Sequence, residues 1–295
     1  MDGRVLVLGA TGAVGRGVVE ELVTRGESVR AASRDPDAAR ARAPRLVEWV
    51  RMDLERPDTF EAALAGVDRV FLIARPGDEE PERVAGPLIE AMRRAGTRHV
   101  VSLTALGVET RNDISLRKVE LLLEESGLEY THLRPNFFMQ VFTTDPLLPA
   151  IRSTGAIRLP AGEARVSYID ARDIAAVAAA ALTEPGHAGG AYTLTGPEAL
   201  DHAVVAALVS EAAGARIRYE PATEEEARAA LAGAGFPARR VERLIGFYRL
   251  VRAGFCAPVS GDVERVLGRP PTPFTRFADE HSSRWRVLEM AGAGR

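Results

Sequence analysis

Hydrophobic and polar positions follow two alternating periods through the first 135 residues. Short apolar runs predict six strands, at residues 4–8, 27–33, 46–51, 69–73, 99–103 and 129–133. The segments between them space apolar residues as an amphipathic helix does, for example at Val18, Val19, Leu22 and Val23. Strands that alternate with helices at this spacing are typical of a parallel sheet covered on both faces. We therefore predict an α/β fold with a doubly wound parallel Rossmann sheet.

The pattern changes after Pro135. Residues 136–169 are rich in proline, glycine and aromatic residues and have weak periodicity. An alanine-rich helix is expected at 173–183 and a strand at 191–195, so segments near 165–196 should return to the sheet. The rest of the chain is mainly helical. We predict that it forms a smaller, mainly helical C-terminal cap.

The composition excludes several classes of function. A net charge of −3 gives no bulk attraction to nucleic acid or to an anionic membrane. The longest apolar run, at residues 174–182, is far shorter than the roughly 20 residues that span a bilayer. The N-terminus has no signal-peptide pattern, so we expect a cytoplasmic protein. The single cysteine, Cys256, excludes a disulfide framework, and the five histidines lack ligand spacing, so we predict no metal site.

The strongest motif is a glycine-rich turn between the first predicted strand and the first predicted helix. Its spacing is G-x-x-G-x-x-G, from Gly9 to Gly15. The first glycine permits a tight turn, the second lets the backbone approach a pyrophosphate, and the third lets the helix lie close to the sheet. Free N–H groups at the helix N-terminus favour phosphate. The alternative is a turn without a ligand. We predict a dinucleotide site formed by Gly9, Thr11, Gly12, Ala13, Val14 and Gly15.

The end of the second predicted strand distinguishes the two nicotinamide dinucleotides. An acidic residue there would accept the ribose 2′-hydroxyl of NAD, whereas this chain has Ser33 and Arg34. Arginine pairs bidentately with phosphate, so these residues favour NADP(H). The alternative is a solvated arginine, which the neighbouring Asp35 favours. We predict NADP(H) as the cofactor.

Two further segments follow strands at the same edge of the predicted sheet. Asp53 and Leu54 follow the third strand and are placed to contact the adenine, although Asp53 is equally explained as a helix cap. Ala74 and Arg75 follow the fourth strand. The topology predicts that these two residues border the middle section of the cofactor.

Three more motifs extend the pattern into the second half. They are Glu120 ahead of the run S-G-L-E-Y-T-H-L-R-P at 126–135, Y-I-D-A-R-D-I-A at 168–175, and Y-T-L-T-G-P at 192–197. With the glycine-rich turn, Arg34 and Asp53-Leu54, they resemble the NmrA-like branch of the atypical short-chain dehydrogenase/reductase superfamily over nearly the whole chain. Similar members bind NADP(H). They include quinone, azo-dye and triphenylmethane-dye reductases, enzymes of natural-product pathways, and redox-sensing regulators without turnover.

The acid–base pair of typical short-chain reductases is absent. Those enzymes use a tyrosine followed four residues later by a lysine, but the chain's only lysine, Lys118, is preceded at that distance by Ile114. Isoflavone-reductase-like members have a lysine, and dye reductases often have a histidine, at the position occupied here by Leu116. Lys118 should face away from that position, as a solvated helix residue beside Glu120 and Glu124.

A positioned general acid contributes about 10²–10⁴-fold to a reaction rate. Without one, the chain favours acceptors that take hydride without simultaneous protonation. Thr104, at the end of the fifth strand, is the candidate catalytic hydrogen-bond donor. The alternative explanation for Thr104 is strand capping.

The substrate site is expected at the carboxyl edge of the sheet, beside the nicotinamide. Our candidates are Pro135, Asn136 and Phe138, which follow the sixth strand, and Tyr248 from the helical region. Core packing explains each aromatic residue singly, but together they suggest a flat, apolar ligand. We thus assign residues 1–135 to an NADP-binding core and residues 136–295 to a substrate-binding cap.

Two functional hypotheses result. The first is an NADPH-dependent reductase that transfers hydride directly to an electrophilic aromatic or conjugated acceptor: a quinone, an imine or iminium ion, an enone, or a natural-product intermediate. The alternative is a non-catalytic NADP(H)-sensing regulatory protein of the NmrA type. A sugar-nucleotide epimerase or dehydratase is disfavoured because it normally needs the tyrosine and lysine. The expected partner is a small apolar or aromatic molecule rather than nucleic acid or a membrane, and a homodimer is left open.

Overall fold

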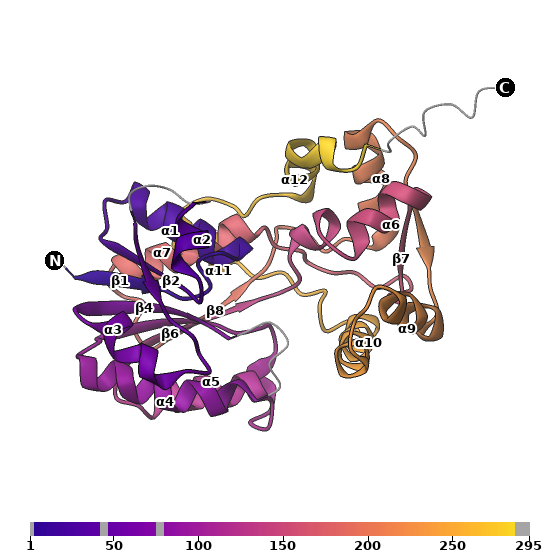
Figure 1. Ribbon diagram of the computed structural model, residues 1–295. Coiled ribbons are helices and arrows are strands. Elements are labelled where there is room, and N and C mark those ends of the chain that lie inside the picture. The colour runs from indigo at the N-terminus through magenta and orange to yellow at the C-terminus, as the bar shows by residue number, and fades with distance from the viewer. Residues whose placement is uncertain (1–2, 42–46, 75–79, 287–295) are drawn as a thin grey trace. The chain divides into compact units, whose positions relative to one another are not determined.

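The computed structural model describes residues 3–41, 47–74 and 80–286 of the 295-residue chain (Figure 1). The chain divides into two compact units. Unit 1 comprises Met1–Pro135, Ala171–Leu194 and Gly261–Pro270. Unit 2 comprises Asn136–Asp170, Thr195–Ser260 and Pro271–Arg295.

Unit 1 is built on a parallel sheet of seven strands in the order β3-β2-β1-β4-β5-β6-β8. The strands are β1 (Arg4–Val7), β2 (Val29–Ser33), β3 (Glu48–Arg51), β4 (Val67–Ile73), β5 (His99–Leu103), β6 (Glu129–Pro135) and β8 (Gly190–Leu194). The order reverses between β1 and β4, which is the point where open α/β sheets bind nucleotides at their carboxyl ends. The predicted Rossmann fold is confirmed.

Helices cover both faces of this sheet, because the central strands are apolar on both sides. Val5, Leu6 and Val7 of β1, for example, are fully buried. The helices are α1 (Ala13–Thr24), α2 (Pro36–Arg40), α3 (Phe60–Leu64), α4 (Pro81–Ala95), α5 (Ser115–Glu124), α7 (Ala171–Thr183) and α11 (Asp262–Leu267). Figure 1 shows α1, α7 and α11 on one face and α3, α4 and α5 on the other.

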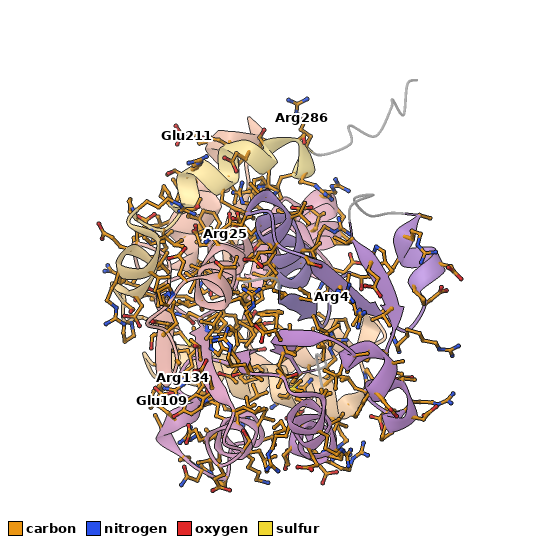
Figure 2. All side chains as sticks on the ribbon, turned by 90° about the vertical axis from the view of Figure 1, so that its left-hand side faces the viewer. Arg4, Arg25, Glu109, Arg134, Glu211 and Arg286 are labelled. Atoms are coloured by element: carbon orange, nitrogen blue, oxygen red, sulfur yellow. The ribbon has the colours of Figure 1, made fainter. Side chains whose placement is uncertain are left out.

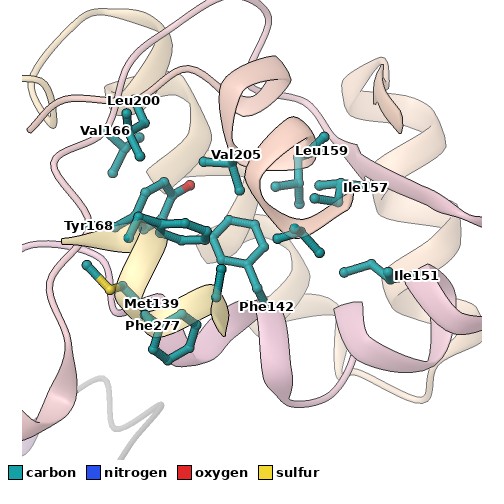
Figure 3. Packing of buried hydrophobic residues seen from close by; sticks show 14 of the residues in the cluster. Met139, Phe142, Ile151, Ile157, Leu159, Val166, Tyr168, Leu200, Val205 and Phe277 are labelled. Carbon is teal, nitrogen blue, oxygen red and sulfur yellow. The ribbon is translucent and has the colours of Figure 1, made fainter. Parts of the chain in front are cut away.

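Unit 2 has its own apolar core (Figure 3), in which Met139, Phe142, Tyr168 and Phe277 pack together. Its helices are α6 (Leu147–Thr154), α8 (His202–Ala213), α9 (Glu224–Gly233), α10 (Ala238–Arg252) and α12 (Phe274–His281). It also has a two-stranded parallel sheet formed by β7 (Ala156–Leu159) and β9 (Arg218–Pro221), which the sequence pattern did not predict.

Short 3₁₀ turns complete the described structure, at Pro57–Thr59, Val108–Thr110, Met139–Thr143 and Ser282–Arg284. Residues 261–270, which the sequence boundaries assigned to the cap, belong to unit 1, where α11 packs on α7. Asp262 accepts a hydrogen bond from the backbone N–H of Thr193 in β8 (2.7 Å). No helix in the described part of the chain is both long and apolar enough to cross a membrane.

Candidate cofactor-binding and reductase site

The glycine-rich turn joins β1 to α1, and its geometry excludes side chains at two positions. Gly9 has a φ of +66°, and a Cβ there would lie 2.7 Å from Ile73 Cγ2. A Cβ on Gly15 would lie 2.2 Å from the carbonyl oxygen of Gly9, well inside contact distance. The N–H of Gly12 donates to that same carbonyl at 2.9 Å. The turn is therefore closed tightly enough that only glycine fits.

The N-terminus of α1 is left open for an anion. Its N-cap residue, Gly12, offers no side-chain cap, and the first turn of the helix contains no acidic residue. Thr11, Gly12 and Ala13 are exposed, whereas the side chain of Val14 is buried. Val14 therefore has only its backbone N–H to offer. Free N–H groups with the positive end of the helix dipole fit the pyrophosphate of a dinucleotide.

The guanidinium of Arg34 follows β2 and pairs with no residue that the structure describes. The carboxylate of Asp35 accepts a hydrogen bond from the N–H of Ala38 (3.0 Å) and caps α2. The hydroxyl of Ser33 donates to the carbonyl oxygen of Asp35 (2.9 Å). Arg34 is exposed and has no hydrogen bond or ion pair with any described residue. Asp35 is thus occupied as a helix cap and does not neutralise Arg34.

Leu54 and Ala74 come together in a small apolar hollow of unit 1. Ile73, Pro81 and Val84 also line it. Such a surface suits one face of a flat heterocycle. The carboxylate of Asp53 instead accepts the backbone N–H of Glu55 (3.1 Å) and closes a local turn. Arg75, the other predicted residue here, lies outside the described residues.

Thr104 lies just beyond β5, where its hydroxyl donates to the carboxylate of Glu120 on α5 (2.8 Å). Glu120 is completely buried and also receives two hydrogen bonds from Arg134 (3.0 and 2.8 Å) and one from Arg117 (2.9 Å). Burial opposes ionisation of Glu120, but the hydrogen bonds from Arg134 and Thr104 outweigh it and lower the pKa. The single proton of Thr104 is therefore already directed at a carboxylate.

The same cluster extends to the surface and to β6. The Nε atom of Arg134 lies 3.6 Å from Oε2 of Glu109, and Figure 2 shows the two side chains beside each other. Atoms of Glu120, Glu124 and His132 lie within 4.8 Å of one another, a grouping that can hold a metal. Arg117, however, pairs with both carboxylates, so the cluster's charge is already balanced by guanidinium groups.

Lys118 points away from this cluster. Its ammonium lies 2.9 Å from Glu82 of α4 and its side chain is 45% exposed. The prediction that Glu120 and Glu124 are its neighbours was wrong, because both pair with Arg117 on the same helix.

The predicted substrate residues lie at the end of β6 and in unit 2. Pro135 is buried as the last residue of β6. The side-chain amide of buried Asn136 donates to the Ser167 hydroxyl and to the Cys256 carbonyl, both at 2.8 Å, so it holds three segments of unit 2 together. Phe138 is half-buried beside Ile169, and Tyr248 is half-buried on α10.

Comparison with known proteins identifies the family. Residues 9–185 match the model of a family described as NAD(P)H-binding. This chain belongs to that family. It is 39% identical over 283 residues to an NAD(P)H azoreductase of Xenophilus azovorans, covering 95% of this chain and 98% of the relative. It is also 38% identical over 287 residues to a (4-alkanoyl-5-oxo-2,5-dihydrofuran-3-yl)methyl phosphate reductase of Streptomyces griseus, covering 94% and 98%.

A solved structure shows the same fold. The triphenylmethane reductase of a Citrobacter species, crystallised with NADP(H), superposes with a TM-score of 0.81 at 25% identity over 95% of this chain and 99% of that one. The prediction of an NAD(P)H-dependent oxidoreductase is thus confirmed. The glycine turn fits such a cofactor, because the absence of Cβ atoms at Gly9 and Gly15 keeps the turn tight. The N-terminus of α1 fits it as well, because the first helical turn has no acidic residue that would repel a phosphate.

The central position of Glu120 in this cluster was not predicted from the sequence. A local signal was available, because Arg117 and Glu124 lie three residues before and four residues after it, on the same face of α5. Its stronger partners, Thr104 and Arg134, come from the ends of β5 and β6. Helical spacing carries no information about those contacts.

Proposed function

We propose that the protein is an NADPH-dependent reductase that transfers hydride directly to an electron-poor conjugated acceptor. The acceptor classes are quinones, imines or iminium ions, enones, and natural-product intermediates that contain such a group. The observation that carries the proposal is the open, uncapped glycine turn, in a chain whose relatives at 38–39% identity are named as reductases over nearly its whole length.

Arg34 supports NADPH over NADH. Its guanidinium follows β2, where the adenosine ribose is bound in Rossmann folds, and it has no ion pair among the described residues. A 2′-phosphate would give it a charge-assisted partner. The backbone N–H groups of Ala13 and Val14, at the start of α1, would hold the pyrophosphate. Leu54 and Ala74 would contact the adenine.

The names of the relatives suggest what their acceptors share. An azo compound, a conjugated dihydrofuranone and a triphenylmethane cation differ in structure, but each has an electron-poor atom in a conjugated system. Hydride adds to such an atom without a proton moving at the same moment. This class therefore suits a site without a tyrosine–lysine pair.

The side chains at the ends of β5 and β6 support the same mechanism. When bound, NADPH supplies a hydride, which carries two electrons and one proton. A quinone then needs one further proton to become the hydroquinone. The Thr104 hydroxyl donates a hydrogen bond to the Glu120 carboxylate, and the lowered pKa of Glu120 keeps that carboxylate ionised. We assign Thr104 to holding this carboxylate, and the second proton comes from water.

A panel of acceptors tests the proposal. Purified protein with NADPH should reduce menadione, a cationic triphenylmethane dye or a sulfonated azo dye, and NADPH oxidation is followed at its absorbance maximum. NADH serves as the control and should be used less efficiently. The absence of turnover across all three acceptors, with NADPH still bound in calorimetry, would overturn the reductase proposal. The relatives' names favour turnover over the alternative of a non-catalytic sensor.

A further inference from the structure

The side chains at the end of β2 supply only part of what a 2′-phosphate needs. Ser33 donates its one hydroxyl proton to the carbonyl oxygen of Asp35 (2.9 Å). A phosphate oxygen is an acceptor, so this hydroxyl has no second proton to offer it. A phosphate monoester carries a charge of about −1.5 to −2 at neutral pH, of which the guanidinium of Arg34 balances one unit. The remaining charge favours a second cation from a neighbouring strand.

The end of β3 lies directly beside the end of β2 and provides such a cation. Ser33 and Arg51 are partners in the parallel register of the two strands. The backbone N–H of Met52 donates to the carbonyl oxygen of Ser33 (2.9 Å), so this bond joins the peptide group before Arg34 to the peptide group after Arg51. Neighbouring strands lie only about 4.8 Å apart. The two arginines therefore leave adjacent strand ends within reach of one phosphate.

The Arg51 guanidinium is available for a ligand. It is exposed and has no hydrogen bond or ion pair with any described residue. Asp58 is close enough to feel its charge, but Asp58 pairs with Arg56 (2.8 Å), whose hydrogen bond is the main reason that the pKa of Asp58 is lowered. Two neighbouring guanidinium groups without an acidic partner repel each other, and a bound anion relieves that repulsion.

We propose that Arg51 is a second ligand of the 2′-phosphate, which it binds together with Arg34, so that two strand ends set the preference for NADPH over NADH. The inference rests on the NADPH preference proposed above and adds a residue to it. All of the residues involved belong to unit 1. The spacing of the glycine-rich motif does not indicate Arg51, because only the register of β2 and β3 brings it to Arg34.

The experiment uses two ligands that differ only in the 2′-phosphate, adenosine 2′,5′-bisphosphate and 5′-AMP, and measures their Kd by isothermal titration. Wild type should bind the bisphosphate more tightly. Arg51→Ala should raise the Kd for the bisphosphate about tenfold, as expected for loss of one charge-assisted contact, and the Kd for 5′-AMP less than twofold. Arg51→Lys should lose less than Arg51→Ala, because it keeps the positive charge.

Arg94→Ala is the matched control, because it removes one positive charge from an exposed position of the same unit. Arg94 lies in the last turn of α4, ahead of the first residue of β5 and hence at the amino edge of the sheet, whereas the cofactor turn is at the carboxyl edge. This variant should match wild type for both ligands. Thermal melting verifies that each variant is folded.

The outcomes separate this inference from the reductase proposal. Wild-type Kd values in Arg51→Ala overturn the role of Arg51 and leave the NADPH-dependent reductase standing. An equal loss for both ligands also overturns that role, because the effect then does not depend on the 2′-phosphate. Equal binding of the two ligands by wild type overturns Arg51 and the NADPH preference together. The expected loss in Arg51→Ala, without turnover of any acceptor by wild type, supports Arg51 and overturns only the reductase function.

Discussion

At the scale of single side chains, Arg34 carries the cofactor preference that we propose. Arg34 has no ion pair with any described residue, so its replacement should act mainly on the contact with the cofactor. Arg34→Ala should raise the Kd for NADPH by roughly tenfold to a hundredfold, the range typical of one charge-assisted interaction, and change the Kd for NADH less than twofold. Isothermal titration measures both constants. Arg94→Ala, at an exposed position in the last turn of α4, is the matched control. An equal increase in the Kd for NADPH and for NADH would contradict the assignment of Arg34 to the 2′-phosphate.

A second test at this scale distinguishes two roles of the Thr104 hydroxyl: holding the Glu120 carboxylate or donating to the substrate. Thr104→Val keeps the shape and removes the hydrogen bond to a buried carboxylate (2.8 Å). We expect a loss of about 1–3 kcal/mol in the free energy of unfolding and a change of less than about fivefold in kcat with menadione. Urea denaturation and steady-state rates provide the two readouts. A catalytic donor would instead lose about 100-fold or more in kcat with little change in stability.

Local contacts were predictable at the residue scale, and long-range ones were not. The roles of Gly9 and Gly15 follow from their spacing, because the atoms that exclude a Cβ at Gly15 belong to the turn itself. Asn136 was expected to face a substrate, yet its amide holds Ser167 and the carbonyl of Cys256, which is 120 residues away. Only the folded chain brings those partners to it.

At the scale of elements, one methyl group added at Gly15 should disturb the junction of β1 and α1. In Gly15→Ala the new Cβ would lie 2.2 Å from the carbonyl oxygen of Gly9, so α1 must move away from the turn. We expect NADPH binding to weaken at least tenfold and the free energy of unfolding to fall by about 1–3 kcal/mol.

The control for this variant makes the same change inside another helix. Gly86 lies within α4, and a Cβ there would meet no atom within 4 Å. Gly86→Ala should therefore stabilise the protein by up to about 1 kcal/mol and leave the Kd for NADPH unchanged. Thermal melting and calorimetry measure the pair. Similar behaviour of the two variants would mean that the turn tolerates a side chain.

The elements themselves differ in how far the sequence predicts them. Four strands of the first half, β1, β2, β4 and β5, are short, mainly apolar runs buried on both faces, so their pattern is locally complete. The β7–β9 pair joins residues about 60 positions apart through two four-residue strands, each too short for a periodic signal. The return of α11 to unit 1 depends on contacts with α7 and β8 that no local pattern contains.

At the scale of the whole molecule, buried neutral histidines should make stability depend on pH. Burial lowers the pKa of His99 in unit 1 and of His202 in unit 2 to about 4, from an ordinary value of 6.5. Burial also lowers the pKa of His132, against the attraction of Glu120 and Glu124. In the unfolded chain all three recover ordinary values. Between pH 6.5 and 4 the unfolded state therefore binds more protons than the folded state, and acid favours unfolding.

The loss of stability caused by the histidines falls in a different pH range from the loss caused by the carboxylates. Glu120 and Glu224 have lowered pKa values, so they weaken the fold only below about pH 4.5. Between pH 7 and pH 5, His99 and His202 should each lower the free energy of unfolding by roughly 2 kcal/mol, since one pKa unit corresponds to 1.36 kcal/mol. Urea denaturation at pH 7, 6 and 5 measures the slope.

His202→Gln keeps a polar group near Tyr168 Oη, the partner of His202 Nε2 (2.8 Å), and removes the titration. The variant should lose stability at pH 7, where the native hydrogen bond and ring stacking on Tyr219 are intact. It should also show a shallower fall toward pH 5 than wild type, and His99→Gln should behave alike because it removes the corresponding group of unit 1. The slopes, unlike the stabilities at pH 7, report only proton uptake. If both variants keep the wild-type slope between pH 7 and pH 5, these histidines are already accessible to protons in the folded state, and the acid sensitivity of the protein must come from its carboxylates instead.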